Sequence, residues 1–211
     1  MRATPWHRAA SVELGVRSGV LAGMIWASGA ALADCPGHVS DVKGIELSRT
    51  EPFLGNVYRQ TSTGLTEARV MERDGEVEEV STVYPHALAP GERISAQGSL
   101  ILDYVADLSE LDRLNETGTW TSEVVLRVNG QAVMTGRAEK RLAGTEMITV
   151  GECRTEVWLV EDRLELGQGD GDWMLLSYAP ALGLVVRSMT LSAEGKPLQG
   201  VEFDTIRALV D

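Results

Sequence analysis

Apolar and β-branched residues follow one another in short runs from Val42 onward, and turn residues separate these runs. The runs lack the sustained spacing of three and four residues that is typical of long helices. Runs of this length bounded by Gly, Asn, Asp and Pro are typical of strands. The pattern therefore predicts a mainly β protein, with a single curved antiparallel sheet or a partly open barrel and one short helix.

Four turn signals predict hairpins. Asp74-Gly75 and Asn129-Gly130 favour the positive φ angles that two-residue hairpin turns require. A longer glycine-rich turn is predicted over residues 167–172. Residues 194–197 are predicted to close a last hairpin, whose second strand would run over 198–209.

One segment departs from this pattern. Leu108, Leu111 and Leu114 recur at a spacing of three, and Asp107 before them can cap a first helical turn. This spacing predicts a short helix of about two turns that covers one end of the sheet. A loop whose leucines cover the edge of the core is the alternative.

The N-terminal residues resemble an export signal. Basic residues precede an apolar stretch of about 15 residues, and Ala31-Leu32-Ala33 fits the small-x-small pattern that signal peptidase cleaves. We predict that residues 1–33 are a signal peptide, that residues 34–211 form a single β-rich domain, and that the protein is located in the periplasm. No integral membrane segment is predicted after removal of the signal.

Two alternatives use the same residues. An uncleaved membrane anchor needs about 20 apolar residues, and this stretch is shorter and rich in small residues. A lipoprotein would be cleaved before Cys35 and acylated there, but Asp34 stands where that motif requires a small residue. Cleavage after Ala33 therefore remains the prediction, with a lipid anchor on Cys35 as the minor alternative.

The charge of the chain bears on its partners. The net charge is −12 at pH 7, and removing residues 1–33 takes away three arginines and one glutamate, which changes it to −14. A field of this sign repels nucleic-acid phosphates and anionic membrane surfaces. We therefore expect neither as a partner.

The chain has two cysteines, Cys35 and Cys153. In an oxidising compartment such a pair is expected to form one disulfide, which would hold the N-terminal end of the mature chain. Neither cysteine has the Cys-x-x-Cys spacing of a redox site.

Part of the second half, from about residue 118 to 207, resembles an uncharacterised group of exported bacterial β-sheet proteins. The resemblance is carried by Trp120, by Thr149–Cys153 and above all by Tyr178–Arg187, which has the form Tyr-x-Pro-x-x-Gly-x-Val-x-Arg. It implies a periplasmic, mostly antiparallel sheet and no established activity. The segment Gly151-Glu152-Cys153 departs from the Ala-Gly-aromatic turn of the group.

The same segment supplies the candidate ligand-binding residues. Pro180 and Gly183 predict a bend or bulge that leads into a buried run, and Tyr178 would cover it. Tyr178 and Arg187 are candidates for lining a binding site. The alternative places Tyr178 in the core and Arg187 on the wet face of the sheet.

Catalytic and metal-binding patterns are sparse. His86 has no nucleophile motif near it, and residues 40–43 match Ser-x-x-Lys without the other motifs of penicillin-binding enzymes. Asp170 and Asp172 could bind Ca²⁺ weakly, but the remaining ligands of a known calcium loop are missing. We predict no catalytic residues, no metal site and no cofactor.

These observations favour a non-catalytic binding or carrier protein of the cell envelope. A curved sheet can offer a concave apolar face to a lipid or another hydrophobic molecule. A hydrolase with a site around His86 and a structural partner in an envelope complex are the alternatives. A polar cluster around His86 would favour the hydrolase, an enclosed apolar cavity the carrier, and a flat apolar patch the structural partner.

Overall fold

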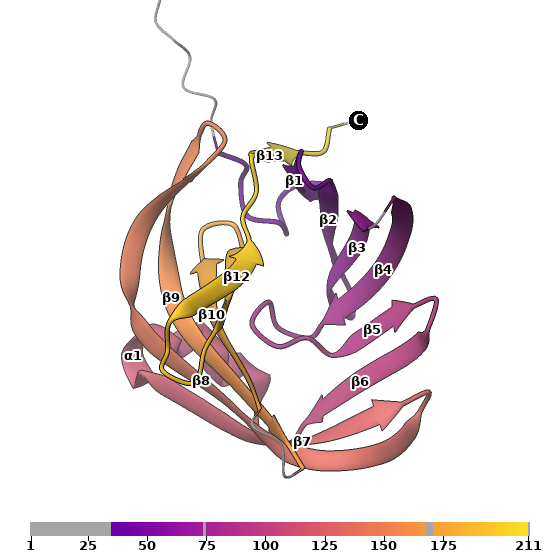
Figure 1. Ribbon diagram of the computed structural model, residues 1–211. Helices are drawn as coiled ribbons and strands as arrows, with labels where there is room; N and C mark the ends of the chain where they lie inside the picture. The colour runs from indigo at the N-terminus through magenta and orange to yellow at the C-terminus, as the bar shows by residue number, and fades with distance from the viewer. Residues whose placement is uncertain (1–34, 74, 168–170, 211) are drawn as a thin grey trace, which may run out of the picture. The chain divides into compact units, whose positions relative to one another are not determined.

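The computed structural model describes residues 35–73, 75–167 and 171–210. The predicted signal peptide lies outside these residues. The described chain forms 13 strands and one short helical segment, a 3₁₀ turn η1 followed by α1 (Figure 1): β1 (Ile45–Arg49), β2 (Leu54–Thr61), β3 (Gly64–Arg73), β4 (Glu76–Tyr84), β5 (Glu92–Ser95), β6 (Gly98–Tyr104), η1 (Leu108–Arg113), α1 (Leu114–Thr117), β7 (Thr119–Val128), β8 (Gln131–Val150), β9 (Cys153–Leu166), β10 (Asp172–Ala179), β11 (Leu184–Leu191), β12 (Pro197–Val201) and β13 (Thr205–Ala208).

All 13 strands belong to one antiparallel sheet. Strands β1 to β12 pair in chain order, and β13 pairs with β1 at the opposite edge from β12. The sheet curves back on itself without closing into a barrel (Figure 1). Its two edge strands, β12 and β13, are connected along the chain by residues 202–204. The predicted fold class, a single curved antiparallel sheet with one short helix, is confirmed.

The last predicted strand was wrong in its extent. Residues 198–209 do not form one strand, because β12 ends at Val201 and β13 begins at Thr205 on the other edge of the sheet. Hydrogen bonds made by Asp204 explain the break. The Asp204 N–H donates to the Ser48 carbonyl at 2.8 Å, and the Asp204 carboxylate accepts from the Thr50 N–H at 2.8 Å. These bonds fix residue 204 beside β1.

The predicted helix is confirmed and is longer than expected. The Asp107 carboxylate accepts from the Ser109 N–H at 2.9 Å, which caps the start of η1. Gly118, at φ +76°, ends α1 in the left-handed conformation. Leu111 and Leu114 are fully buried and pack in the core at one end of the sheet.

The tight hairpins occur where they were predicted. Asn129 and Gly130 have φ values of +49° and +81°, and Val128 pairs with Gln131 across the turn. Arg73 pairs with Glu76 across the other predicted turn. The sequence pattern was sufficient here because the turn residues determine the local backbone conformation.

The interior of the sheet holds two apolar clusters. One lies near β1, β2 and the β8–β9 turn, and the other packs around η1 and α1. A disulfide joins Cys35 to Cys153, with 4.8 Å between the Cα atoms, and so ties the segment before β1 to the start of β9. This pairing confirms the prediction. No helix among the described residues has the length and apolar character needed to cross a membrane.

Candidate functional site

Polar side chains interrupt the apolar interior along β2 and β3. The alternation of a strand directs Leu54, Asn56 and Tyr58 of β2 inward, and Asn56 is 1% exposed. On β3 the same alternation directs Leu65 and Glu67 inward, and Glu67 is also 1% exposed. The interior face therefore carries a buried carboxylate and a buried amide between apolar neighbours.

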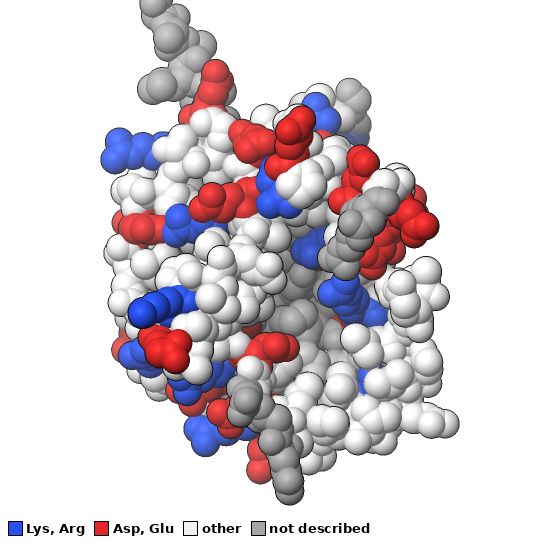
Figure 2. Space-filling view, in the orientation of Figure 1, with Lys and Arg blue, Asp and Glu red and all other residues white. Residues whose placement is uncertain are grey.

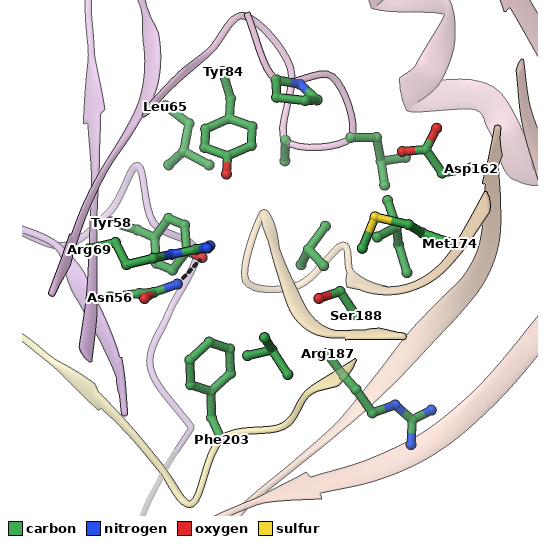
Figure 3. A pocket seen from close by; sticks show the side chains of 16 residues that line it. Asn56, Tyr58, Leu65, Arg69, Tyr84, Asp162, Met174, Arg187, Ser188 and Phe203 are labelled. Atoms are coloured by element: carbon green, nitrogen blue, oxygen red, sulfur yellow. Dashed lines mark hydrogen bonds between the residues drawn. The ribbon is translucent and has the colours of Figure 1, made fainter. Parts of the chain in front are cut away.

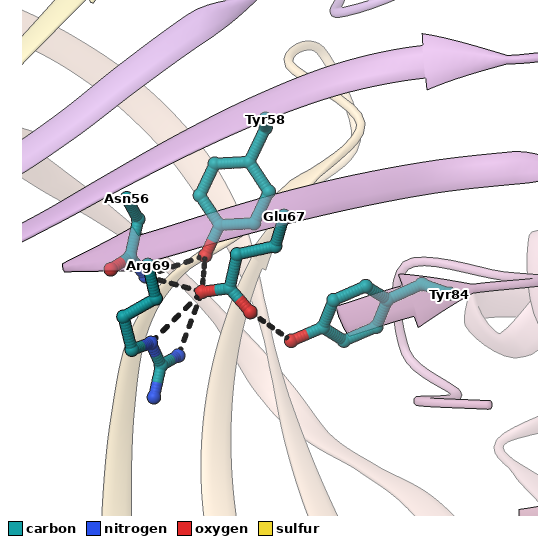
Figure 4. Close-up of polar contacts among 5 residues, drawn as sticks. All are labelled: Asn56, Tyr58, Glu67, Arg69 and Tyr84. Atoms are coloured by element: carbon teal, nitrogen blue, oxygen red, sulfur yellow. Dashed lines mark hydrogen bonds and ion pairs between the residues drawn. The ribbon is translucent and has the colours of Figure 1, made fainter. Parts of the chain in front are cut away.

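Glu67 accepts five hydrogen bonds from four side chains (Figure 4). Its Oε1 accepts from Asn56 Nδ2 at 2.5 Å, from the Tyr58 hydroxyl at 3.1 Å, and from Arg69 Nε and Nη2 at 3.1 and 2.8 Å. Its Oε2 accepts from the Tyr84 hydroxyl at 2.7 Å. We call these five residues the Glu67 cluster. It compensates the cost of removing the carboxylate from water.

The electrostatics of the Glu67 cluster favour ionised Arg69 and neutral tyrosines. Burial, and then the nearby carboxylate of Glu67, raise the pKa of both Tyr58 and Tyr84 well above the ordinary value. Burial is the largest single influence on Arg69 and acts to lower its pKa, but the charge and hydrogen bonds of Glu67, with smaller contributions from Tyr58 and Tyr84, together raise the pKa overall. The phenols therefore act as hydrogen-bond donors to a charged carboxylate.

A cavity of about 290 Å³ lies beside this cluster (Figure 3). Strands β2 to β4 and the loop after β4 form one wall, and β9 to β12 with Phe203 form the facing wall. Most lining side chains are apolar, and the Glu67 cluster makes one end polar. The lining residues are Asn56, Tyr58, Leu65, Arg69, Tyr84, Ala87, Leu88, Pro90, Asp162, Met174, Leu176, Val185, Arg187, Ser188, Val201 and Phe203.

One polar atom beside the cavity has no partner. Asn56 Oδ1 is buried and accepts no hydrogen bond from any described residue. Exchanging the amide oxygen and nitrogen would place an oxygen against the Glu67 carboxylate, so the observed orientation is the favourable one. Asn56 Oδ1 is therefore available to accept a hydrogen bond from a ligand hydroxyl or another donor placed beside it.

A second buried ion pair lies on the far wall. Lys140 is 2% exposed, and its ammonium group contacts the carboxylate of Asp162, which lines the cavity. The two residues face each other on the neighbouring strands β8 and β9. Both walls of the cavity thus contain a compensated charge beneath an otherwise apolar lining.

The two residues proposed from the sequence lie in different places. Tyr178 is 8% exposed and packs edge-on against Trp158, with 5.6 Å between ring centroids, in the cluster around the helix. Tyr178 does not belong to the cavity lining. Arg187 contributes to the lining, but its guanidinium points away from the cavity, donates to Ser177 Oγ at 3.0 Å and contacts Glu146 (Figure 3).

His86 takes part in a local hydrogen-bond network. Its Nδ1 accepts from the Leu88 N–H at 3.1 Å, so the proton lies on Nε2, which donates to Asp112 Oδ1 at 3.3 Å. Burial lowers the pKa of His86 and outweighs the carboxylate of Asp112, so the ring is neutral at pH 7. Since both ring nitrogens already take part in hydrogen bonds, with Leu88 and Asp112, neither is free to accept a proton from a nucleophile.

The remaining catalytic and metal patterns do not come together. Ser40 lies in an exposed turn, where its hydroxyl contacts His38 Nδ1 at 2.7 Å, and this turn is not part of the cavity. Asp170 lies outside the described residues. Within the described ranges, no group of three or more His, Cys, Asp or Glu side chains is placed to hold a metal ion.

Sequence reasoning missed the Glu67 cluster because no motif marks it. One signal was present: Leu65, Glu67, Arg69 and Met71 share the same alternate positions of β3, so two charged residues stand between two apolar ones on one face. A charge in such a place must find partners when the strand is covered. Those partners, on β2 and β4, could not be identified from the sequence.

The chain matches no protein-family model, no curated protein and no solved structure with which it was compared. The proposals below therefore depend on the residues of this chain alone.

Proposed function

We propose that the protein is an exported, non-catalytic binding or carrier protein whose ligand places an apolar group in the cavity. The cavity carries this proposal. Its volume of about 290 Å³ is just below the range of about 300–1,000 Å³ that is usual for small-molecule sites. An apolar lining with a few fixed polar groups is also usual for such sites.

Apolar side chains beyond the cavity support the same proposal. Leu100 of β6 pairs with Val128 of β7, and the two side chains are 46% and 36% exposed. Leu100 also pairs with Arg93 of β5, which pairs with the buried Thr82 of β4. Directly paired residues share one face of a sheet, so the inner face continues as an accessible apolar surface.

The location of the protein is part of the proposal. The disulfide between Cys35 and Cys153 supports an oxidising compartment, for which the periplasm is the proposed location. The alternative of a hydrolase at His86 receives less support, because Leu88 and Asp112 occupy both nitrogens of the ring.

The test uses N-phenyl-1-naphthylamine, a neutral probe that fluoresces strongly in apolar surroundings. Ser188 lines the cavity and points into it (Figure 3), so Ser188→Trp should fill the space. We expect the wild-type protein to bind the probe and the variant to bind it at least about tenfold more weakly, since most of the apolar contact is lost.

Ser81→Trp is the matched control, because Ser81 is exposed on β4 and lies outside the cavity lining. This variant should bind the probe like the wild type. Met174→Trp provides a second block if Ser188→Trp folds poorly, as judged by circular dichroism. Native mass spectrometry of protein isolated from periplasm would reveal a bound natural ligand. The proposal fails if the probe binds neither the wild type nor the control, or binds all variants equally.

A further inference from the structure

Three arginines line a second hollow that adjoins the cavity. This hollow of about 490 Å³ is lined by Arg49, Arg69 and Arg93, and it shares Arg69 and Val201 with the cavity. Glu72 is the one acidic residue in its lining. Figure 2 shows basic side chains inside the hollow that opens between β12 and the strands β4 and β5.

The register of the sheet places the three arginines on the inner face. Arg93 of β5 pairs with Thr82, which pairs with Glu67. Arg69 lies two residues after Glu67 on β3 and therefore on the same face. Arg49 of β1 pairs with Leu54 of β2, whose side chain is buried on that face. The arginines come from three different strands and converge at one end of the interior.

These arginines retain unused hydrogen-bond donors. Arg69 donates to Glu67 through Nε and Nη2, and its Nη1 donates to no described residue (Figure 4). Arg49 donates through Nε to the Pro52 carbonyl at 3.1 Å. Arg93 is exposed and makes no hydrogen bond or ion pair with any described residue. A guanidinium has five N–H donors, so each side chain can bind a further acceptor.

The concentration of positive charge is unusual for this chain. The net charge is −12, with 31 acidic and 19 basic residues, yet arginines outnumber acidic residues three to one in the lining of this hollow. The Arg69 charge is compensated by Glu67, but those of Arg49 and Arg93 are not matched by carboxylates in direct contact among the described residues. Apolar side chains flank the arginines, since Leu54, Met71 and Phe53 also line the hollow.

We propose that Arg49, Arg69 and Arg93 bind the anionic head group of an amphiphile, a carboxylate or a phosphate, whose apolar chain enters the cavity. This inference rests on the proposed function, because it names the class of ligand for the same interior. Guanidinium groups bind carboxylate and phosphate oxygens by charge-assisted hydrogen bonds. The hollow and the cavity share Arg69 and Val201 in their linings, so the two sites adjoin, and we place the junction of head group and chain beside these two residues.

The test measures displacement of N-phenyl-1-naphthylamine by ligands that share one alkyl chain: dodecanoate, dodecyl phosphate and dodecan-1-ol. Inorganic phosphate is added alone as a further arm. At about pH 8 the carboxylic acid is ionised. We expect dodecanoate and dodecyl phosphate to bind the wild type at least about tenfold more tightly than dodecan-1-ol, as charge-assisted hydrogen bonds of ordinary strength would produce.

The double variant Arg49→Gln/Arg93→Gln should lose this preference while binding dodecan-1-ol within about twofold of the wild type. Arg69 is left in place because it compensates Glu67. Arg113→Gln is the matched control, since Arg113 is exposed at the end of η1 and does not line the hollow. Circular dichroism and urea midpoints verify that the variants are folded.

The outcomes separate the two proposals. If dodecan-1-ol and the probe do not bind the wild type, the proposed function itself fails. If they bind but the wild type does not prefer the two anionic ligands over dodecan-1-ol, only the head-group inference is overturned. The same holds if the double variant keeps this preference. If inorganic phosphate at the concentration of dodecyl phosphate abolishes the preference for dodecyl phosphate over dodecan-1-ol without itself displacing the probe, the arginines bind a free anion and the amphiphile inference is overturned.

Discussion

Replacing Glu67 by leucine should destabilise the protein by about 3–5 kcal/mol, the usual cost of removing one partner from a buried ion pair. Glu67 is 1% exposed and accepts hydrogen bonds from Asn56, Tyr58, Arg69 and Tyr84. Leucine has a similar volume, so the packing changes little. The loss would come from donors that no longer have an acceptor.

The size of the loss depends on whether each hydrogen-bond donor can contact water once Glu67 is replaced. A buried donor without a partner costs about 1–3 kcal/mol. Asn56 and Tyr58 are both nearly inaccessible, at 1% and 6% exposure, and would bear this cost. The Arg69 side chain is 25% exposed at the cavity, so water can solvate its guanidinium in part. The sum of the separate costs is therefore an upper bound.

Urea unfolding at about pH 7, followed by tryptophan fluorescence with the disulfide intact, measures the change in the free energy of unfolding. Glu79→Leu is the matched control, because Glu79 is exposed on the adjacent strand β4 and its replacement should change the stability by no more than about 0.5 kcal/mol. The double variant Glu67→Leu/Arg69→Met removes both charges, so it should be more stable than the sum of the two single effects predicts.

Two results would refute this reasoning. If Glu67→Leu lowers the free energy of unfolding by less than about 1 kcal/mol, the hydrogen bonds to the Glu67 carboxylate do not stabilise the fold as argued. If the effects of Glu67→Leu and Arg69→Met are additive, the two side chains are not energetically coupled.

Two further predictions concern the backbone and the pH dependence. Gly183→Ala should lower the free energy of unfolding, measured in urea, by about 1–3 kcal/mol and by more than Gly118→Ala does. Both glycines have positive φ, but only at residue 183 would the new Cβ collide with the His38 ring. Equal losses in the two variants would contradict this reasoning. Burial raises the pKa of all four tyrosines, that of Tyr178 to about 12, so the folded state holds protons that the unfolded chain loses near pH 10. The free energy of unfolding should therefore fall between about pH 10 and 12, and phenolate absorbance should rise only as the protein unfolds. Phenolates that form near pH 10 in the folded protein would refute the raised tyrosine pKa values.

Local features of the fold were predictable because neighbouring residues determine them. Asn129-Gly130 determined its hairpin through backbone angles, and Asp107 with Leu111 and Leu114 determined the short helix through capping and spacing. The disulfide followed from the presence of only two cysteines in a chain for which the sequence predicts export.

Longer-range features were not predictable in the same way. The apolar run after residue 197 reads as one strand, but β13 pairs with β1 because the curvature of the sheet brings the two edges together. For Tyr178 the sequence left two interpretations open, a residue of a binding site or a residue of the core, and the structure places it in the core.

The sequence by itself determined the strand-rich class, the tight turns, the helix and the covalent link, since each depends on backbone preferences or on a single pairing choice. Only the tertiary structure decided where the interior is polar. Glu67 and Arg69 are adjacent on one face of β3. They can be buried there because neighbouring strands bring Asn56, Tyr58 and Tyr84 within hydrogen-bond distance of Glu67. The sheet's curvature, accumulated over 13 strands, then places this cluster opposite β10 to β12 and creates the cavity between them. No local sequence signal encodes such a juxtaposition, because it depends on the register and twist of every strand between the two walls.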